Sequence, residues 1–111
     1  MYDTTLDTSA LPWSPTGWPG VSMKVLQPSA AGGMCGMLRM EPGSSIPAHR
    51  HTHADQAVFV VEGDLIDGGA TYGPGSYLLA KAGTPHGPHT SAGGCVVLST
   101  YFGTPDFVPV G

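Results

Sequence analysis

The chain has 111 residues, enough for one domain that buries a core without disulfides. Glycine and proline together supply a quarter of the residues and charged side chains only 11%, which excludes coiled coils and helical bundles. The formal net charge of -4 lacks the positive surface that nucleic acids and anionic membranes attract, so we expect a small-molecule partner, no nucleic acid and no membrane. Two cysteines, no signal peptide and no apolar run of membrane-spanning length predict a soluble, cytoplasmic protein.

Residues 1–20 are predicted to form an N-terminal docking arm. They contain Trp13 and Trp18, and three prolines among them prevent a helix. Aromatic side chains without a core of their own must pack against this subunit or a neighbouring one, because large exposed apolar patches are uncommon. We therefore predict that the arm docks on a barrel, that residues 21–111 form a single domain, and that the chain forms a homodimer through the arm.

Short β-type runs follow the arm, separated by turns rich in glycine and proline. They predict strands over residues 21–26, 34–40, 57–61, 76–80 and 95–102. Many short strands and no helical period favour an all-β sandwich or barrel. We expect Tyr77, Tyr101 and Phe102, which lie on these strands, in the barrel core.

The five histidines fall into two clusters, at residues 49, 51 and 53 and at residues 86 and 89. In a strand, residues two apart project from the same face, so His49 and His51 can converge while Arg50 points away. A third imidazole from a distant strand can complete the set, and such triads bind zinc, iron, nickel, copper or manganese. For His53 and His89 exposure to solvent stays an equal alternative, although His89 could hydrogen-bond a bound substrate.

The first cluster lies in a motif that resembles the first cupin motif. It runs from Gly43 through five residues to His49-x-His51, through four residues to Gln56, and through six residues to Gly63. Cupins usually have glutamate at the position of Gln56. The resemblance makes position 56 a candidate metal ligand beside the two histidines.

The second cluster lies in a motif that resembles the second cupin motif, and it begins only 11 residues after the first motif ends. It runs from Gly75 through five residues to Lys81-x-Gly83-x-x-His86, with Lys81 where cupins usually have proline. The resemblance implies a small RmlC-like cupin, which is a double-stranded β-helix or jelly-roll barrel. It also implies that one divalent transition metal per subunit is bound at the barrel mouth by His49, His51, Gln56 and His86.

Gln56 departs from the usual cupin pattern by being neutral. A divalent cation bound by three imidazoles and an amide keeps more positive charge than one bound to glutamate, so the site should attract anions more strongly. Cupins that isomerise uronates in pectin breakdown use such a glutamine as a ligand, whereas acetylacetone-cleaving dioxygenases bind the metal through three histidines alone. Asp55, one residue away, is expected on the other face of the strand.

Two further segments resemble particular cupin groups. Residues 7–13 and 20–26 are similar to the beginning of dihydroxyacetophenone and acetylacetone dioxygenases. The Pro85-His86 pair and Gly94-Cys95 are shared with the cupin domain of zinc-binding anti-sigma factors. No helical sigma-binding segment precedes the motifs in this sequence, so we do not expect a separate regulator of that kind.

The resemblance implies a metal-dependent enzyme in which His49, His51 and His86 carry the catalysis through the bound metal. Fe(II) is favoured, and with it a dioxygenase that cleaves a carbon–carbon bond of a small enolisable carbonyl compound, a β-diketone or hydroxyketone. Zinc, nickel or manganese would instead support a non-oxidative isomerase or lyase of sugar-acid type. The third alternative is a non-catalytic module that senses a metal or a ligand.

Overall fold

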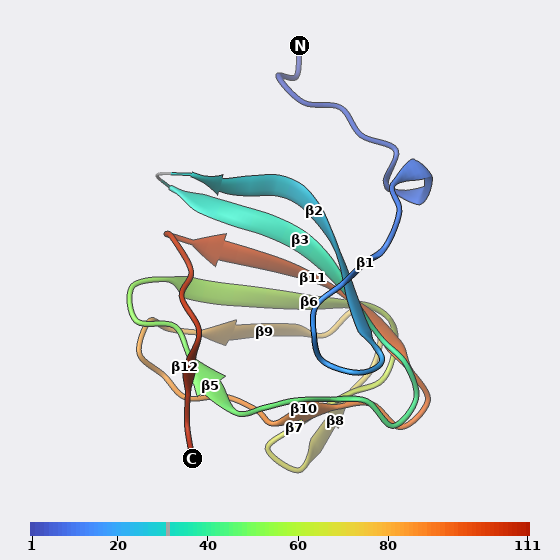
Figure 1. Cartoon of the computed structure of the whole chain (residues 1–111), viewed down its shortest axis with the longest axis vertical. Coiled ribbons are helices and arrows are strands. Elements are labelled where there is room, and N and C mark those ends of the chain that lie inside the picture. Colours follow the sequence, from blue (N-terminus) through green and yellow to red (C-terminus); the bar gives the residue numbers. More distant parts are fainter. Residues whose placement is uncertain (31) are drawn as a thin grey trace.

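The computed structural model describes residues 1–30 and 32–111. Its regular structure consists of one 3-10 helix, η1 (Thr8–Ala10), and β-strands (Figure 1). The strands are β1 (Ser14–Pro15), β2 (Val21–Ala30), β3 (Gly33–Met40), β4 (Ser45–Ile46), β5 (His49–Arg50), β6 (Asp55–Gly63), β7 (Leu65–Asp67), β8 (Ala70–Tyr72), β9 (Tyr77–Ala80), β10 (His89–Thr90), β11 (Cys95–Phe102) and β12 (Val108–Pro109). Within the described residues no helix is long and apolar enough to cross a membrane.

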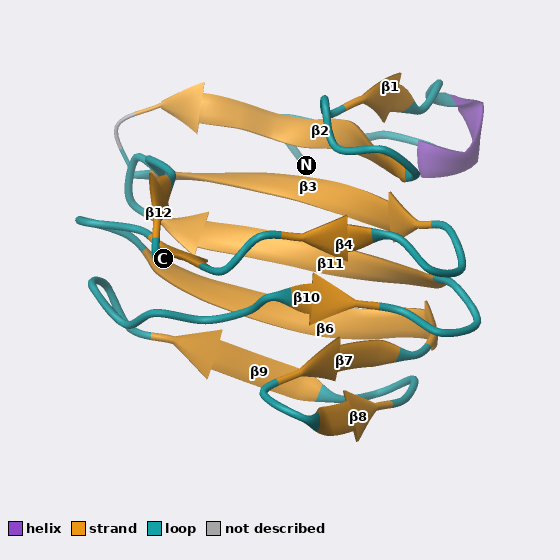
Figure 2. Ribbon diagram, turned by 60° about the horizontal axis from the view of Figure 1, so that its bottom comes forward, coloured by secondary structure: helices purple, strands orange, loops and turns teal. Residues whose placement is uncertain are grey.

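The strands form two layers of antiparallel sheet. The first layer has the strand order β1-β2-β3-β11-β6-β9, and the second has the order β4-β10-β7-β8. Figure 2 shows the four-stranded sheet lying across the six-stranded one, and β12 pairs with β5 near one end. The arrangement confirms the predicted all-β double-stranded β-helix.

The five predicted strands correspond to β2, β3, β6, β9 and β11. The strands that the sequence did not reveal are only two or three residues long. Such segments cannot show the alternation of apolar and polar residues by which strands are recognised, and they exist because a neighbouring strand completes their hydrogen bonds.

The core lies between the two layers, on one face of each long strand. Along β6, Val58 and Val60 face inward, whereas Phe59 and Val61 on the other face remain exposed. Buried side chains from both layers complete the core: Val21, Met40, Ile46, Val60, Leu65, Cys95 and Val97. The same inward face of β6 carries Gln56, so the core continues directly into the candidate site.

The expectation that Tyr77 and Phe102 belong to the core is wrong. Their side chains are 62% and 57% exposed. Tyr77 on β9 pairs with Phe59 on β6. Because side chains alternate between the two faces of a strand, the rings of Tyr77 and Phe59 both lie on the outer face of the six-stranded sheet. The prediction that Tyr77 and Phe102 lie on strands is therefore correct, but the prediction that their side chains face the core is wrong.

The arm packs against its own chain through both tryptophans. Two cations lie over the Trp13 ring: Lys24 Nζ is 4.5 Å and Arg39 Cζ is 4.7 Å from the ring centroid. Lys24 Nζ also donates a hydrogen bond to the Thr8 carbonyl at 2.7 Å. Trp18 packs against the core. Since the two rings are accommodated within one chain, they do not require arm exchange. The homodimer and the boundary at residue 20 stay predictions, and light scattering tests the first of them.

The last glycine of the first motif, Gly63, is required by both its backbone conformation and its surroundings. Its φ is +80°, and a Cβ atom there would collide with the Gly94 carbonyl and lie 2.6 Å from Cys95 Cα. Gly63→Ala should therefore lower the free energy of unfolding by on the order of 3 kcal/mol or more, measured by urea denaturation.

Gly75→Ala is the matched control for this substitution. Gly75 has a similar φ of +89°, but a Cβ there would have no atom within 4 Å. We expect a cost of about 1 kcal/mol, from backbone conformation alone. Equal costs for the two variants would show that the close approach of β6 to β11 is unimportant.

Candidate metal centre

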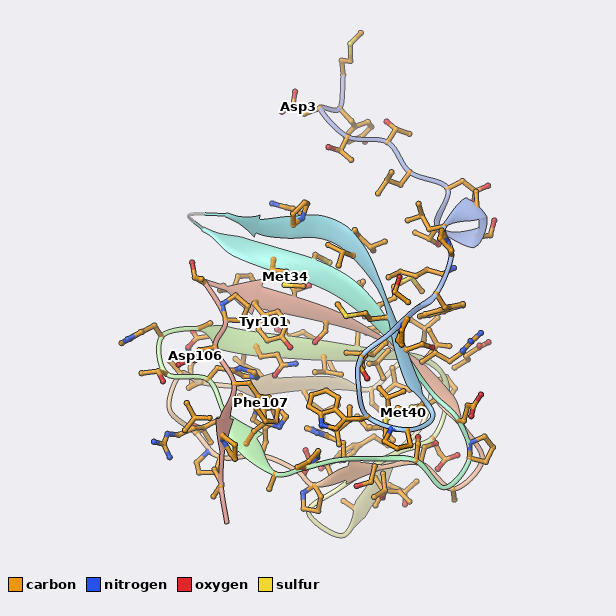
Figure 3. All side chains as sticks on the ribbon, in the orientation of Figure 1. Asp3, Met34, Met40, Tyr101, Asp106 and Phe107 are labelled. Atoms are coloured by element: carbon orange, nitrogen blue, oxygen red, sulfur yellow. The ribbon has the colours of Figure 1, made fainter. Side chains whose placement is uncertain are left out.

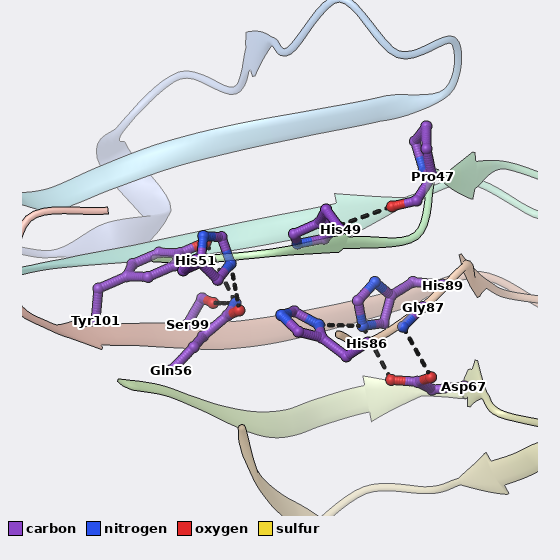
Figure 4. Close-up of polar contacts among 10 residues, drawn as sticks. All are labelled: Pro47, His49, His51, Gln56, Asp67, His86, Gly87, His89, Ser99 and Tyr101. Carbon is purple, nitrogen blue, oxygen red and sulfur yellow. Dashed lines mark hydrogen bonds and ion pairs between the residues drawn. The ribbon is translucent and has the colours of Figure 1, made fainter. Parts of the chain in front are cut away.

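Three histidines from the two motifs lie together at one end of the core (Figure 4). His49 is on β5, His51 follows it directly, and His86 lies in the loop before β10. The backbones of His49 and His86 exchange two hydrogen bonds, each 2.9 Å from nitrogen to oxygen. Their ring centroids are 4.4 Å apart, and those of His49 and His51 are 4.9 Å apart. The structure thus brings together His49, His51 and His86 as predicted, while Arg50 is exposed.

Two of these rings are oriented by main-chain carbonyl groups. His49 Nδ1 donates to the Pro47 carbonyl at 2.8 Å, and His51 Nδ1 donates to the Asp106 carbonyl. Because a carbonyl only accepts, Nδ1 carries a proton in both rings, which leaves Nε2 as the nitrogen that could bind a metal. This is the arrangement found around metal-binding histidines, whose second nitrogen is usually hydrogen-bonded.

The surroundings of the His86 ring indicate whether a metal fits the cluster. Its Nε2 is buried and has no hydrogen-bond partner in the part of the chain that the structure describes. A ring nitrogen from each of His49, His51 and His86 lies within 4.8 Å of the others. A buried polar atom without a partner is costly, and a cation that accepts its lone pair removes that cost. The three imidazoles could therefore hold a transition metal, and their chemistry suits several such ions.

Burial favours the neutral form of two of these imidazoles, His86 and His49. It lowers the pKa of His86 to about 4, with the neighbouring histidines His49 and His89 lowering the pKa further. Burial also lowers the pKa of His49, although the bond to Pro47 opposes the shift. Neutral imidazole is the form that binds metals, so protons compete weakly with a cation at neutral pH.

Gln56 borders the histidine cluster from β6. Its Oε1 lies 2.9 Å from His51 Nε2, and its Nε2 donates to Ser99 Oγ at 2.7 Å and to Tyr101 Oη at 3.3 Å. The amide is buried and contacts the nitrogen that a metal would use, but its role as a metal ligand stays a prediction. Tyr101, expected in the barrel core, instead lines the cavity beside these residues.

Two other residues of the first motif point away from the cluster. Asp55 Oδ2 lies 3.7 Å from Lys81 Nζ, and Asp55 Oδ1 accepts a hydrogen bond from the Ala82 amide. These contacts agree with the prediction that the pleat of the strand turns the Asp55 side chain outward. His53 is exposed. The second cluster differs, because His89 is buried and its Nε2 lies 3.3 Å from His86 Nδ1.

The C-terminal segment also contributes to the site, which the sequence did not indicate. Phe107 stacks on His49 with ring centroids 4.3 Å apart, and the Asp106 carboxylate accepts hydrogen bonds from the Thr52 amide and hydroxyl. Both residues lie beside β12 (Figure 3). Residues 103–111 have no periodicity that could have revealed this role, and only the pairing of β12 with β5 brings them to the histidines.

Two cavities adjoin the cluster. One of about 70 Å³ lies beside His49, His51 and Phe107, and the other, of about 170 Å³, lies beside His86 and Asp67. Gln56, Val58, Leu65 and His89 line both cavities, and the remaining walls are mostly aliphatic or aromatic. In the described part of the chain, none of the four lysine and arginine residues lines either cavity.

Replacing each of His49, His51 and His86 by alanine should abolish stoichiometric metal binding, because two imidazoles alone hold a divalent cation weakly. Protein stripped with a chelator, loaded with Zn²⁺ and desalted is analysed for zinc per chain. His53→Ala is the control and should retain the parent stoichiometry, since His53 is exposed and outside the cluster. Full occupancy in any of the three cluster variants would remove that histidine from the metal centre.

Comparison with known proteins agrees with this architecture. No curated protein matches the sequence. The polyketide cyclase RemF from Streptomyces resistomycificus is similar in structure, with TM-score 0.83, 19% identity, and coverage of 97% of this chain and 85% of RemF. KdgF from Halomonas sp. has TM-score 0.80 and 20% identity, with 95% of this chain and 97% of KdgF covered.

A third similar structure is a protein from Methylibium petroleiphilum PM1 assigned as an acetylacetone dioxygenase. Its TM-score is 0.79 at 18% identity, with 100% of this chain and 88% of that chain covered. At these identities the likenesses show the fold. The ChrR Cupin-like domain family matches residues 1–103. The chain therefore belongs to the ChrR Cupin-like family of cupins.

Proposed function

We propose that this chain is a metal-dependent cupin enzyme that binds Fe(II) through His49, His51 and His86. Its reaction is the dioxygen-dependent cleavage of a carbon–carbon bond in a small enolisable carbonyl compound, a β-diketone or hydroxyketone. The observation that carries this proposal is the character of the two cavities beside the histidines. They are small and largely apolar, and among the described residues no lysine or arginine lines them.

The cavity walls favour a diketone over a sugar acid. A sugar acid presents a carboxylate and several hydroxyl groups, and burying them without matching partners costs free energy. The walls opposite the histidines are formed by aliphatic side chains such as Leu38, Val58 and Val97. A β-diketone needs polar contacts only at its two oxygens, and the rest of the molecule suits apolar walls.

The neutral ligand set supports binding of an enolate anion. Three imidazoles add no negative charge, and Gln56 is neutral where most cupins have a carboxylate. A bound divalent cation would keep its positive charge, which stabilises the enolate form of the substrate. When bound, Fe(II) supplies the redox chemistry with dioxygen that the cleavage requires.

The protein groups around the cluster orient and isolate the substrate. Phe107 and Trp18, whose ring centroids are 5.2 Å apart, form an aromatic wall of the smaller cavity and limit the access of water. Tyr101 and Ser99 hydrogen-bond Gln56 and hold its amide beside His51. Burial raises the pKa of Tyr101, so its hydroxyl keeps its proton and remains available as a hydrogen-bond donor.

Oxygen consumption tests the reaction directly. Fe(II)-loaded protein with pentane-2,4-dione should take up about one O₂ per diketone consumed, faster than the same concentration of free Fe(II). His86→Ala should show only the free-ion rate. No uptake above that rate with any of a panel of β-diketones and hydroxyketones would contradict the dioxygenase.

Conversion of an unsaturated uronate, measured beside oxygen uptake, distinguishes the two alternatives. An isomerase or lyase of sugar-acid type would convert an unsaturated uronate without oxygen when loaded with zinc, nickel or manganese. The structural likeness to KdgF supports this alternative. The absence of cationic side chains among the described residues that line the cavities counts against it. A non-catalytic sensing module, which the match to the ChrR Cupin-like family supports, would bind metal tightly and turn over neither substrate.

Gln56→Glu tests the importance of neutral ligands. The added carboxylate should tighten divalent-metal binding and weaken binding of the enolate, raising the KM for pentane-2,4-dione by about tenfold, which corresponds to about 1.4 kcal/mol. Gln27→Glu, at an exposed position on β2, adds the same charge away from the site and should change neither quantity. Unchanged metal affinity and KM in Gln56→Glu would place Gln56 outside the metal centre.

A further inference from the structure

We propose that Asp67 is a positioning residue for His86, acting through His89 and through the backbone of Gly87. This inference rests on the proposed metal centre and assigns a role to two buried or half-buried side chains that the centre itself does not use. Asp67 is at the end of β7, and His89 begins β10.

The three metal-binding histidines differ in what holds their second nitrogen. His49 and His51 are each oriented by a main-chain carbonyl, from Pro47 and Asp106 respectively. His86 has no such carbonyl, and its Nδ1 instead meets His89 Nε2 at 3.3 Å. The orientation of His86 therefore depends on side chains, whereas the other two rings are held by backbone atoms.

The Asp67 carboxylate contacts both parts of the loop that carries His86 (Figure 4). Its Oδ1 accepts a hydrogen bond from the Gly87 amide at 3.1 Å. Its Oδ2 accepts a hydrogen bond from His89 Nε2 at 3.1 Å, and the two side chains are 19% and 11% exposed. Because this N–H is directed at the carboxylate, His89 supports the His86 ring by packing against it and not by accepting its proton. One carboxylate thus holds the backbone next to His86 and the imidazole that touches the His86 ring, in a largely desolvated place where such contacts are strong.

The two ring nitrogens of His86 have different surroundings. His86 Nδ1 faces His89, while the opposite nitrogen, Nε2, is the buried atom that has no partner among residues 1–30 and 32–111. A rotation of the His86 ring would move this Nε2 away from His49 and His51. Removing the support of Asp67 should therefore weaken metal binding without removing a ligand, as loss of such outer hydrogen bonds does by about 10- to 100-fold elsewhere.

A direct role of Asp67 as a metal ligand is the competing explanation. Donor atoms of Asp67, His86 and His89 also lie within 4.8 Å of one another. However, the two Asp67 oxygens are both engaged, with Gly87 and with His89, so they already satisfy these partners. We therefore infer positioning, and the number of ions bound per chain separates the two explanations.

The experiment titrates chelator-stripped protein with Co²⁺ and records affinity, ions per chain and the visible spectrum of the bound ion. Asp67→Asn and His89→Leu should each bind one Co²⁺ with a Kd at least tenfold above that of the parent and with an altered spectrum. His89→Gln, whose amide can still donate to Asp67, should recover part of the affinity.

Asp64→Asn is the matched control, because Asp64 holds another loop through the amides of Ala92 and Gly93 and does not contact the histidines. It should lower the Tm and leave Co²⁺ affinity and spectrum unchanged. Parent-like affinity in both Asp67→Asn and His89→Leu would overturn the positioning role. So would two Co²⁺ per parent chain with one lost in Asp67→Asn, which would make Asp67 a ligand. A parent that binds no Co²⁺ would instead overturn the metal centre itself.

Discussion

The candidate site depends on a pair of backbone hydrogen bonds between His49 and His86. These residues are far apart in the chain, yet each donates its amide to the carbonyl of the other. The bonds place the second motif beside the first and set the distance between the two imidazoles. Because the bonds are made by main-chain atoms, the relative position of the two histidines is determined by the fold of the barrel and depends little on their side chains.

Burial of several imidazoles in one place has an electrostatic consequence. Charged histidines so close together, with little water, would repel one another, and burial lowers the pKa of His86 to about 4. His86 is therefore neutral at pH 7, and its buried Nε2 has no partner within the described structure. Neutrality, orientation by carbonyl groups and an unpartnered nitrogen are all properties that favour a bound cation.

The cationic side chains of the described residues lie away from the two cavities. Arg50 and Lys81 are exposed, and Lys24 and Arg39 lie against Trp13 on the opposite side of the six-stranded sheet from the core. A cation in the histidine cluster would thus be the strongest positive charge near the substrate. This arrangement supports a small substrate that becomes anionic on binding.

The alternation of apolar and polar residues is a local property, and it predicted an all-β fold and its five longest strands. The resemblance of two segments to the cupin motifs implied the double-stranded β-helix and the histidines that converge. The sequence also placed Asp55 correctly on the opposite face from Gln56. Only the tertiary structure decided which face of the sheet Tyr77 and Phe102 occupy, and that Asp67, Asp106 and Phe107 belong to the site. These residues act through contacts with segments distant in the chain, and such contacts leave no periodic pattern in the sequence. They arise only when the two layers close and the C-terminal strand pairs with β5.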